Sequence, residues 1–169
     1  MKVTFKNMLF IFITEKGIAT IVISFLLIFI GKDLLSSTFG QILFSLLFAY
    51  TYLPSIYLQA EYYFRNRNMK VFIENKSLIV EKDGIIETIE YKDIDRIIEY
   101  PSGTEKGESL FSAVGKPWGC YHYMRIITNS KKEVIITCLM NPKLYELFDQ
   151  FKGVKVYIWY TRFPSTFIL

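Results

Sequence analysis

The stretch Glu61–Phe72, "EYYFRNRNMKVF", separates two parts of the chain that have different patterns. Before it the sequence is almost continuously apolar, and after it apolar and polar residues alternate. Long apolar runs are typical of membrane-spanning helices, whereas alternation is typical of strands that bury one face. We therefore predict a transmembrane helical anchor over residues 1–62 and a second domain over residues 63–169.

Two uncharged runs precede this boundary. Gly17–Gly31 holds 15 residues and Leu34–Ala60 holds 27. A spanning helix needs about 20 residues, so the first run requires either an extension back through residues 8–14 or an interfacial helix over them. Lys32 and Asp33 are the only charges between the runs, so the segment "IGKDLLSS", residues 30–37, is predicted to form a tight hairpin turn. A cleaved signal peptide is the alternative for the first run, but a second long apolar run follows it and no small-residue cleavage site does.

Basic residues flank the predicted hairpin at its two ends. Lys2, Lys6 and Lys16 precede or begin it, and the membrane-proximal basic residues Arg65, Arg67 and Lys70 follow it. By the positive-inside rule, this distribution predicts a multi-pass protein of the cytoplasmic (inner) membrane with both termini cytoplasmic. The second run has no ionisable residue of the kind that marks an ion path, so the hairpin is interpreted as an anchor.

Short alternating segments follow residue 68. "MKVFIE", "SLIVEK", "IIETIEY" and "IDRIIEY" predict a four-stranded meander, and Asp83-Gly84 is a strong hairpin signal. "YHYMRIIT" and "EVIITCLM" predict a second hairpin. Between these groups lies Ser102–Gly119, which contains four glycines and is long for a loop.

The segment "NPKLYELFDQFKG" predicts an amphipathic α-helix. Asn141 suits the N-cap, Pro142 the first helical position and Gly153 the C-terminal stop. Leu144, Leu147, Phe148 and Phe151 recur with helical spacing and would pack on the sheets. The remaining tail is too apolar for a solvated end. It is predicted to add a strand or pack on the domain, with a return to the membrane interface as the alternative.

These elements, together with the run "IEYKDIDRIIEY", resemble the bacterial pleckstrin-homology-like (PH-like) domains that are attached to short membrane hairpins. The resemblance covers about residues 68–153. It implies an α+β fold, in which a two-helix transmembrane hairpin precedes a partly open antiparallel β-barrel of two nearly orthogonal sheets, capped by a C-terminal α-helix. It also implies a non-catalytic role.

The chain departs from the family in its charges. Eukaryotic members bind inositol phosphates through basic residues around the first hairpin. Here Lys70, Lys76 and Lys82 are interleaved with Glu74, Glu81 and Asp83. This pattern does not favour binding of a phosphorylated headgroup.

The residues that could carry catalysis are few. His122 is the only histidine, and we interpret it as a strand residue in or beside the core. A metal site with Cys120 and Cys138 is not favoured, because pairing of Thr128 with Glu133 would put His122 and Cys138 on opposite faces.

We predict no catalytic residue, no metal, no cofactor and no small-molecule substrate. The two cysteines fit a reducing compartment. The net charge of +4 arises from 20 basic and 16 acidic residues spread along the chain, so nucleic-acid binding is not predicted either.

The long loop offers the best predicted partner-binding residues, Leu110, Phe111 and Trp118, because aromatic anchors on loops are common interaction sites. Packing under the loop as a satellite core is the alternative. We predict a membrane protein whose cytoplasmic PH-like domain binds a protein partner, or another copy, as an adaptor, assembly or regulatory subunit. Two alternatives are an effector or toxin-immunity factor that acts through the hairpin, and a module that senses anionic lipid.

Overall fold

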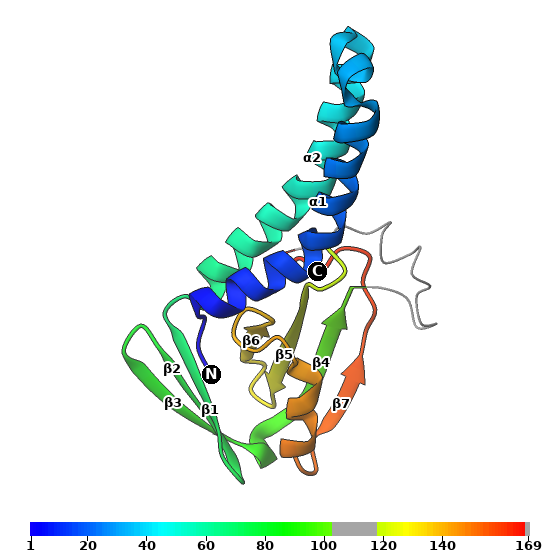
Figure 1. Ribbon diagram of the computed structural model, residues 1–169. Helices are drawn as coiled ribbons and strands as arrows, with labels where there is room; N and C mark the ends of the chain where they lie inside the picture. The colour runs from blue at the N-terminus through cyan, green and yellow to red at the C-terminus, as the bar shows by residue number, and fades with distance from the viewer. Residues whose placement is uncertain (103–117, 168–169) are drawn as a thin grey trace.

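The computed structural model describes residues 1–102 and 118–167; in the first helix it gives residues 15, 18–19, 22, 26–30 and 32–35 by their backbone alone. Two long helices, α1 (Phe5–Ser36) and α2 (Thr38–Asn66), form a hairpin that rises from two sheets (Figure 1). Helix α1 continues past Lys32 and Asp33 to Ser36, and the chain turns at Ser37, the last residue of the predicted turn. Leucines favour helix, whereas Ser37 is a good N-cap and its Oγ accepts from the Gly40 N–H at 3.0 Å.

Helix α1 changes direction along its length. Its first part, darkest blue in Figure 1, lies across the sheets, and the rest rises beside α2. Among the described residues, one helix, Thr38–Asn66, is long and apolar enough to cross a membrane, and Phe5–Thr14 is a shorter apolar stretch. The two helices form a hairpin, and its crossing of a membrane stays a prediction.

The first sheet is a three-stranded antiparallel meander of β1 (Met69–Ile73), β2 (Ser77–Lys82) and β3 (Ile85–Glu90). The predicted turn between β2 and β3 is confirmed, with positive φ at Asp83 (51°) and Gly84 (82°). The prediction of a fourth strand in this meander was wrong. A short 3₁₀ turn, η1 (Tyr91–Asp93), redirects the chain into the second sheet.

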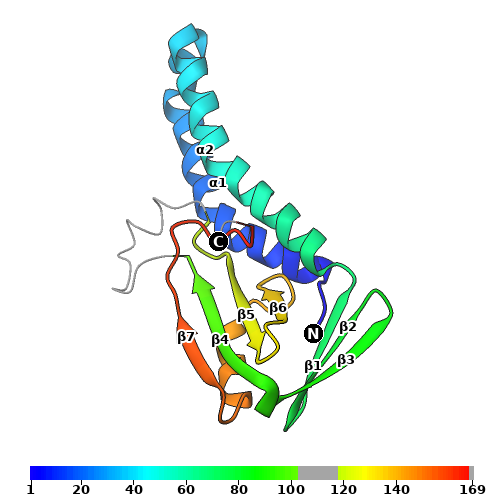
Figure 2. The ribbon, with the colours of Figure 1, turned by 180° about the vertical axis from the view of Figure 1, so that it is seen from behind.

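The second sheet has the order β6-β5-β4-β7 (Figure 2). It contains β4 (Ile94–Pro101), β5 (His122–Thr128), β6 (Glu133–Thr137) and β7 (Lys155–Ile158). Strand β7 comes from the apolar tail, which confirms that the tail adds a strand. It runs parallel to β4, so the prediction of purely antiparallel sheets is corrected. The two sheets are separate, which confirms a partly open arrangement.

The predicted capping α-helix is a seven-residue 3₁₀ helix, η2 (Leu144–Gln150). Asn141 accepts a hydrogen bond from the Lys143 N–H at 3.0 Å, but it lies outside the helix and does not cap it. Lys143 has a non-helical backbone, which leaves only two turns before Gly153 takes a positive φ of 82°. The apolar face was predicted correctly, because Leu144, Leu147 and Phe151 are buried in the core between the sheets.

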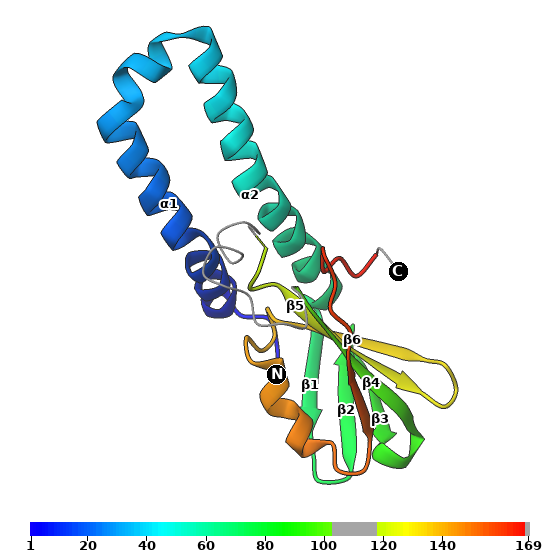
Figure 3. The ribbon, with the colours of Figure 1, turned by 90° about the vertical axis from the view of Figure 1, so that its right-hand side faces the viewer.

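The second sheet buries both of its faces. One face packs against the first sheet and η2 in a largely aliphatic core, and the other packs against the helices. The second cluster unites Ile11, Leu58 and Tyr62 of the helices with the tyrosines at 100, 121 and 123 of the second sheet and its approach. Figure 3 shows the last part of α2 beside β5 and β6. The domain boundary between residues 62 and 63 stays a prediction, and this cluster contains residues from both sides of it.

Candidate interaction surfaces

A cleft of about 390 Å³ opens between the first sheet and β6. The end of α2 forms one wall, β2 and β3 form another, and β6 with the turn that precedes it forms the third. Its lining consists of Arg65, Asn66, Met69, Val80, Lys82, Asp83, Ile85, Glu87, Lys132, Glu133, Val134 and Ile135. The cleft therefore combines an apolar floor with charged rims.

Two ion pairs and a hydrogen bond occupy acidic groups of this cleft. Lys132 Nζ on the turn before β6 forms an ion pair with the Glu87 carboxylate on β3, which joins the two sheets across the opening. Arg125 Nε lies 3.2 Å from Glu133 Oε2, and Asn68 Nδ2 donates to Asp83 Oδ1 at 2.7 Å. At the rim, Lys132, Glu87 and Glu133 therefore have partners of opposite charge, which differs from the concentrated positive charge that a polyphosphate needs.

Strand β3 forms one border of the cleft and of the first sheet. Ile85 and Ile86 are 73% and 68% exposed, and the side chain of Ile85 lines the cleft whereas that of Ile86 does not. Among the described residues β3 pairs with β2 alone. An edge strand beside an apolar floor is suited to an added strand from another protein.

Of the three loop residues predicted to bind a partner, the structure describes one. Leu110 and Phe111 lie outside the described residues. Trp118 is half-buried: its Nε1 donates to the Arg162 carbonyl at 2.6 Å, and its ring lies 5.3 Å from Phe163. It also meets Tyr50 of α2 at 6.2 Å. These contacts agree with the alternative in which Trp118 packs under the loop as part of a satellite core. A role of Trp118 in partner binding stays a prediction.

The membrane-proximal basic residues lie around the end of α2. Arg65 Nε donates to Thr166 Oγ1 at 3.2 Å, and its guanidinium lies 5.0 Å from the Phe167 ring. Arg67 is the C-cap of α2, and Lys70 Nζ forms an ion pair with Glu81 at 2.8 Å. Arg65 and Lys70 thus have partners within the chain, and contact of all three residues with lipid stays a prediction.

The tail is attached to α2 by a set of polar contacts that sequence reasoning missed. The buried Glu61 carboxylate accepts from Ser165 Oγ at 2.9 Å, and from the Thr166 N–H and Oγ1 at 2.5 Å each. Tyr62 Oη donates to the Pro164 carbonyl at 2.5 Å. A glutamate that directly follows a 27-residue apolar run was the available signal, because a buried carboxylate needs donors.

His122 lies on β5, with Nδ1 at 3.1 Å from the Cys120 carbonyl oxygen. Burial lowers the pKa of the imidazole. The predicted register is corrected by one residue: Ile127 pairs with Glu133, and the Cys138 N–H donates to the His122 carbonyl. The predicted placement of His122 and Cys138 on opposite faces therefore rested on the wrong register. In the described part of the chain no three His, Cys, Asp or Glu side chains gather as metal ligands.

The family model described as "PH domain" matches residues 1–145, which include both helices and the strands as far as β6. No curated protein and no solved structure matches significantly. PH domains are typically modules that bind proteins or lipids. Because the match spans most of the chain, and because two separate sheets and an apolar helical segment at residues 144–150 agree with the predicted architecture, this protein belongs to the PH-domain family.

Proposed function

We propose that this protein is a membrane-anchored, non-enzymatic PH-domain protein that binds a protein partner as an adaptor, assembly or regulatory subunit. The observation that carries the proposal is the cleft between the sheets. It places the exposed Ile85 of an edge strand beside an apolar floor. A partner segment in extended conformation would add to β3 through its backbone and insert side chains above that floor.

The charges of the cleft favour a protein segment over a phosphorylated lipid headgroup. The lining includes three bases, Arg65, Lys82 and Lys132, and three acids, Asp83, Glu87 and Glu133. A polyphosphate would meet repulsion from the acids, whereas a peptide of mixed charge would be complementary. Leu110 and Phe111 are retained as proposed additional contacts with the partner.

The proposed anchor uses both helices and places both termini on the cytoplasmic side of the inner membrane. Support comes from α2, whose apolar side chains are largely exposed, including Leu46, Leu53 and Ile56. In water this surface would be costly, whereas hydrocarbon accommodates it. Met1 and the last described residues of the tail both lie on the side of the sheets (Figure 1), so one side of the membrane would hold both sheets.

The test compares Ile85→Arg with Ile86→Arg in the full chain, by crosslinking and affinity capture from membranes. The two residues are adjacent and similarly exposed, so the second variant controls for a surface charge on β3. We expect Ile85→Arg to lose a dominant protein partner that Ile86→Arg keeps. Equal capture by both variants and the unchanged chain would exclude the cleft, and capture of no protein by any of them would contradict the adaptor proposal.

A second variant, Leu110→Ser with Phe111→Ser, tests the loop in the same capture experiment. Loss of the partner in this variant alone would move the binding surface from the cleft to the loop. Binding of a soluble inositol polyphosphate to the unchanged chain, abolished by Lys82→Glu, would instead favour the lipid-sensing alternative.

The effector alternative has one supporting observation. Lys16 is buried between the helices, where its Nζ donates to the Thr51 carbonyl at 2.6 Å. Ionisable residues inside a membrane segment often carry function. If the hairpin itself acts on a target, Lys16→Met should abolish activity while leaving partner capture by the cleft intact.

A further inference from the structure

The first part of α1 and the last part of α2 together cover the second sheet. On the side that faces the sheet, Ile11, Leu58 and Tyr62 are buried in the shared core. The two segments are in contact, since Gln59 Nε2 donates to the Met8 carbonyl at 3.4 Å. We call these two segments, residues 5–14 and 56–66, the helical roof of the PH domain.

The other side of the helical roof is apolar and exposed. Phe5, Leu9, Phe10 and Ile13 line one face of α1, and Tyr63 and Phe64 continue the surface on α2. A groove of about 350 Å³ separates the two segments. It is lined by Met8, Phe12, Ile56, Gln59, Ala60, Tyr63 and Phe64, so a single polar side chain, Gln59, contributes to it apart from the tyrosine hydroxyl.

The length of α2 places this surface at the edge of the bilayer. Its 29 residues extend about 43 Å at roughly 1.5 Å per residue, whereas the hydrocarbon core is about 30 Å thick. If the hairpin tip marks the far face, the last turns of α2 emerge at the headgroups of the near leaflet. The apolar surface continues over those turns, through Tyr63 and Phe64.

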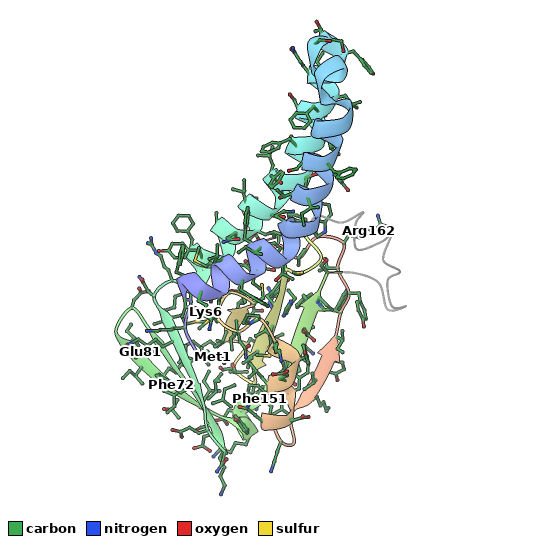
Figure 4. All side chains as sticks on the ribbon, in the orientation of Figure 1. Met1, Lys6, Phe72, Glu81, Phe151 and Arg162 are labelled. Carbon is green, nitrogen blue, oxygen red and sulfur yellow. The ribbon has the colours of Figure 1, made fainter. Side chains whose placement is uncertain are left out.

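Basic side chains lie at the rim of the same surface. Lys6 is exposed on the first part of α1 (Figure 4), and Arg67 is exposed at the end of α2. An apolar helix face with cations at its border is the pattern of a helix that lies in the plane of an anionic membrane surface. The exposed face is also continuous with the part of α2 that the proposed anchor puts in hydrocarbon.

We propose that the helical roof docks on the anionic leaflet that faces the sheets, with its apolar face at the headgroup–acyl boundary and an acyl chain in the groove. This inference rests on the proposed anchor and goes beyond it. In this arrangement the sheets are held at the membrane surface through the helical roof and do not hang from the hairpin alone. The cleft between the sheets then keeps a fixed height above the bilayer.

The test places the photoreactive residue benzoylphenylalanine at one position at a time in the full chain. The protein is reconstituted in vesicles of phosphatidylcholine and phosphatidylglycerol, and lipid adducts are measured by mass spectrometry. Phe10 (57% exposed) and Phe64 (64%) report on the roof, Leu46 (63%) on the anchor, and Phe72 (48%), on β1 away from the helices, is the control (Figure 4).

We expect lipid adducts at Phe10, Phe64 and Leu46 and none at Phe72. Adducts at Leu46 without adducts at Phe10 and Phe64 would overturn the docking and leave the anchor standing. Adducts at Phe10 and Phe64 without adducts at Leu46 would support docking and contradict the anchor. Adducts from Phe10 and Phe64 to a second copy of the chain would overturn the docking, because another protein would then cover the roof.

The basic residues at the border of the helical roof allow a second test of the same proposal. Lys6→Gln and Arg67→Gln should each lower the yield of lipid adducts at Phe10 by about fivefold in anionic vesicles, since one basic residue near such a surface contributes about 1 kcal/mol. Neither change should matter in vesicles of phosphatidylcholine alone. An equal loss in both kinds of vesicle would contradict the role given to the charges.

Discussion

The two faces of the second sheet are buried in different ways. Toward the first sheet, Ile97, Ile126 and Ile136 belong to a core made mainly of aliphatic side chains. Toward the helices, Tyr100 and Tyr123 stack at 4.7 Å, and Tyr62 meets Tyr123 edge-on at 6.3 Å. The second face also carries hydrogen bonds from tyrosine hydroxyls, such as Tyr121 Oη to Gln59 Oε1 at 2.9 Å.

We infer that the first face mainly stabilises the folded sheets, and that the second face mainly sets the orientation of the helices on the sheet. Aliphatic packing is strong but not directional, so the first face determines whether the sheets fold. Tyrosines add directional hydrogen bonds and preferred ring geometries, so the second face fixes how the helices sit on the sheet. The comparison predicts larger effects on global stability from the first face and effects on the attachment of helices and tail from the second.

The largest expected effect is that of Ile126→Ala in the aliphatic face. Ile126 is fully buried, and truncation there should lower the free energy of unfolding by about 2–5 kcal/mol. Chemical unfolding of the full chain in detergent, followed by tryptophan fluorescence, measures the change. Ile86→Ala is the matched control, since it is exposed on β3 and should change the value by less than about 0.5 kcal/mol. Similar values for both variants would argue against the assigned core.

Glu61→Ala should release the tail from α2. It removes the acceptor for Ser165 and Thr166, and hydrogen bonds to a charged group contribute about 1.5–3 kcal/mol. We expect a loss of that size in the free energy of unfolding, together with faster proteolysis of residues 160–169. Glu61→Gln, which keeps one carbonyl acceptor, should lose less. Unchanged proteolysis of the tail in Glu61→Ala would show that the tail is held by other contacts.

Tyr121→Phe removes one directional contact from the second face. Its hydroxyl donates to Gln59 of α2, so the expected loss in the free energy of unfolding is about 1 kcal/mol. Tyr145→Phe, at an exposed position on η2, is the control and should have no measurable effect. A loss of several kcal/mol at Tyr121 would mean that this face, too, determines global stability.

Glu99→Gln is expected to stabilise the protein slightly at neutral pH. Glu99 is buried on β4, and burial raises the pKa of its carboxyl group. The folded state then binds the proton more tightly than the unfolded state, so the stability that Glu99 contributes is present at acidic pH and is lost as pH rises through the folded-state pKa. The advantage of Glu99→Gln should therefore shrink as pH falls from 7 toward about 4. A constant advantage across that range would contradict this assignment.

The local elements were largely predictable because each strand carries its own alternation. The positive φ values at Asp83 and Gly84 follow from a two-residue turn that those residues favour. The capping element was mistaken in type, since helical spacing at Leu144, Leu147 and Phe151 is also compatible with a short 3₁₀ segment. Spacing identifies the buried face better than it identifies the hydrogen-bonding pattern.

The long-range features were not predictable from local patterns. Strand β7 reaches β4 across the chain, with Val156 opposite Ile97, and no turn signal announces a parallel pair. The cleft depends on how the two sheets open, which brings Glu87 and Lys132 together from 45 residues apart. The contact of the N-terminus with the first sheet was not predictable either. The Met1 carbonyl accepts a hydrogen bond from the Val71 N–H at 2.8 Å, whereas the sequence predicted only an anchor in this region.

Because the helices and the second sheet share a buried cluster, we expect them to move as one body, so that an anchored hairpin holds the sheets in a fixed orientation. Pulsed electron paramagnetic resonance measures this rigidity, with spin labels on cysteines at Ser45 of α2 and Thr88 of β3, both exposed. A Cys120→Ser background leaves the buried Cys138 as the remaining native thiol. We expect one narrow distance distribution for the full chain in lipid bilayers. A broad distribution spanning many separations would show that the sheets swing on the helices, and would contradict it.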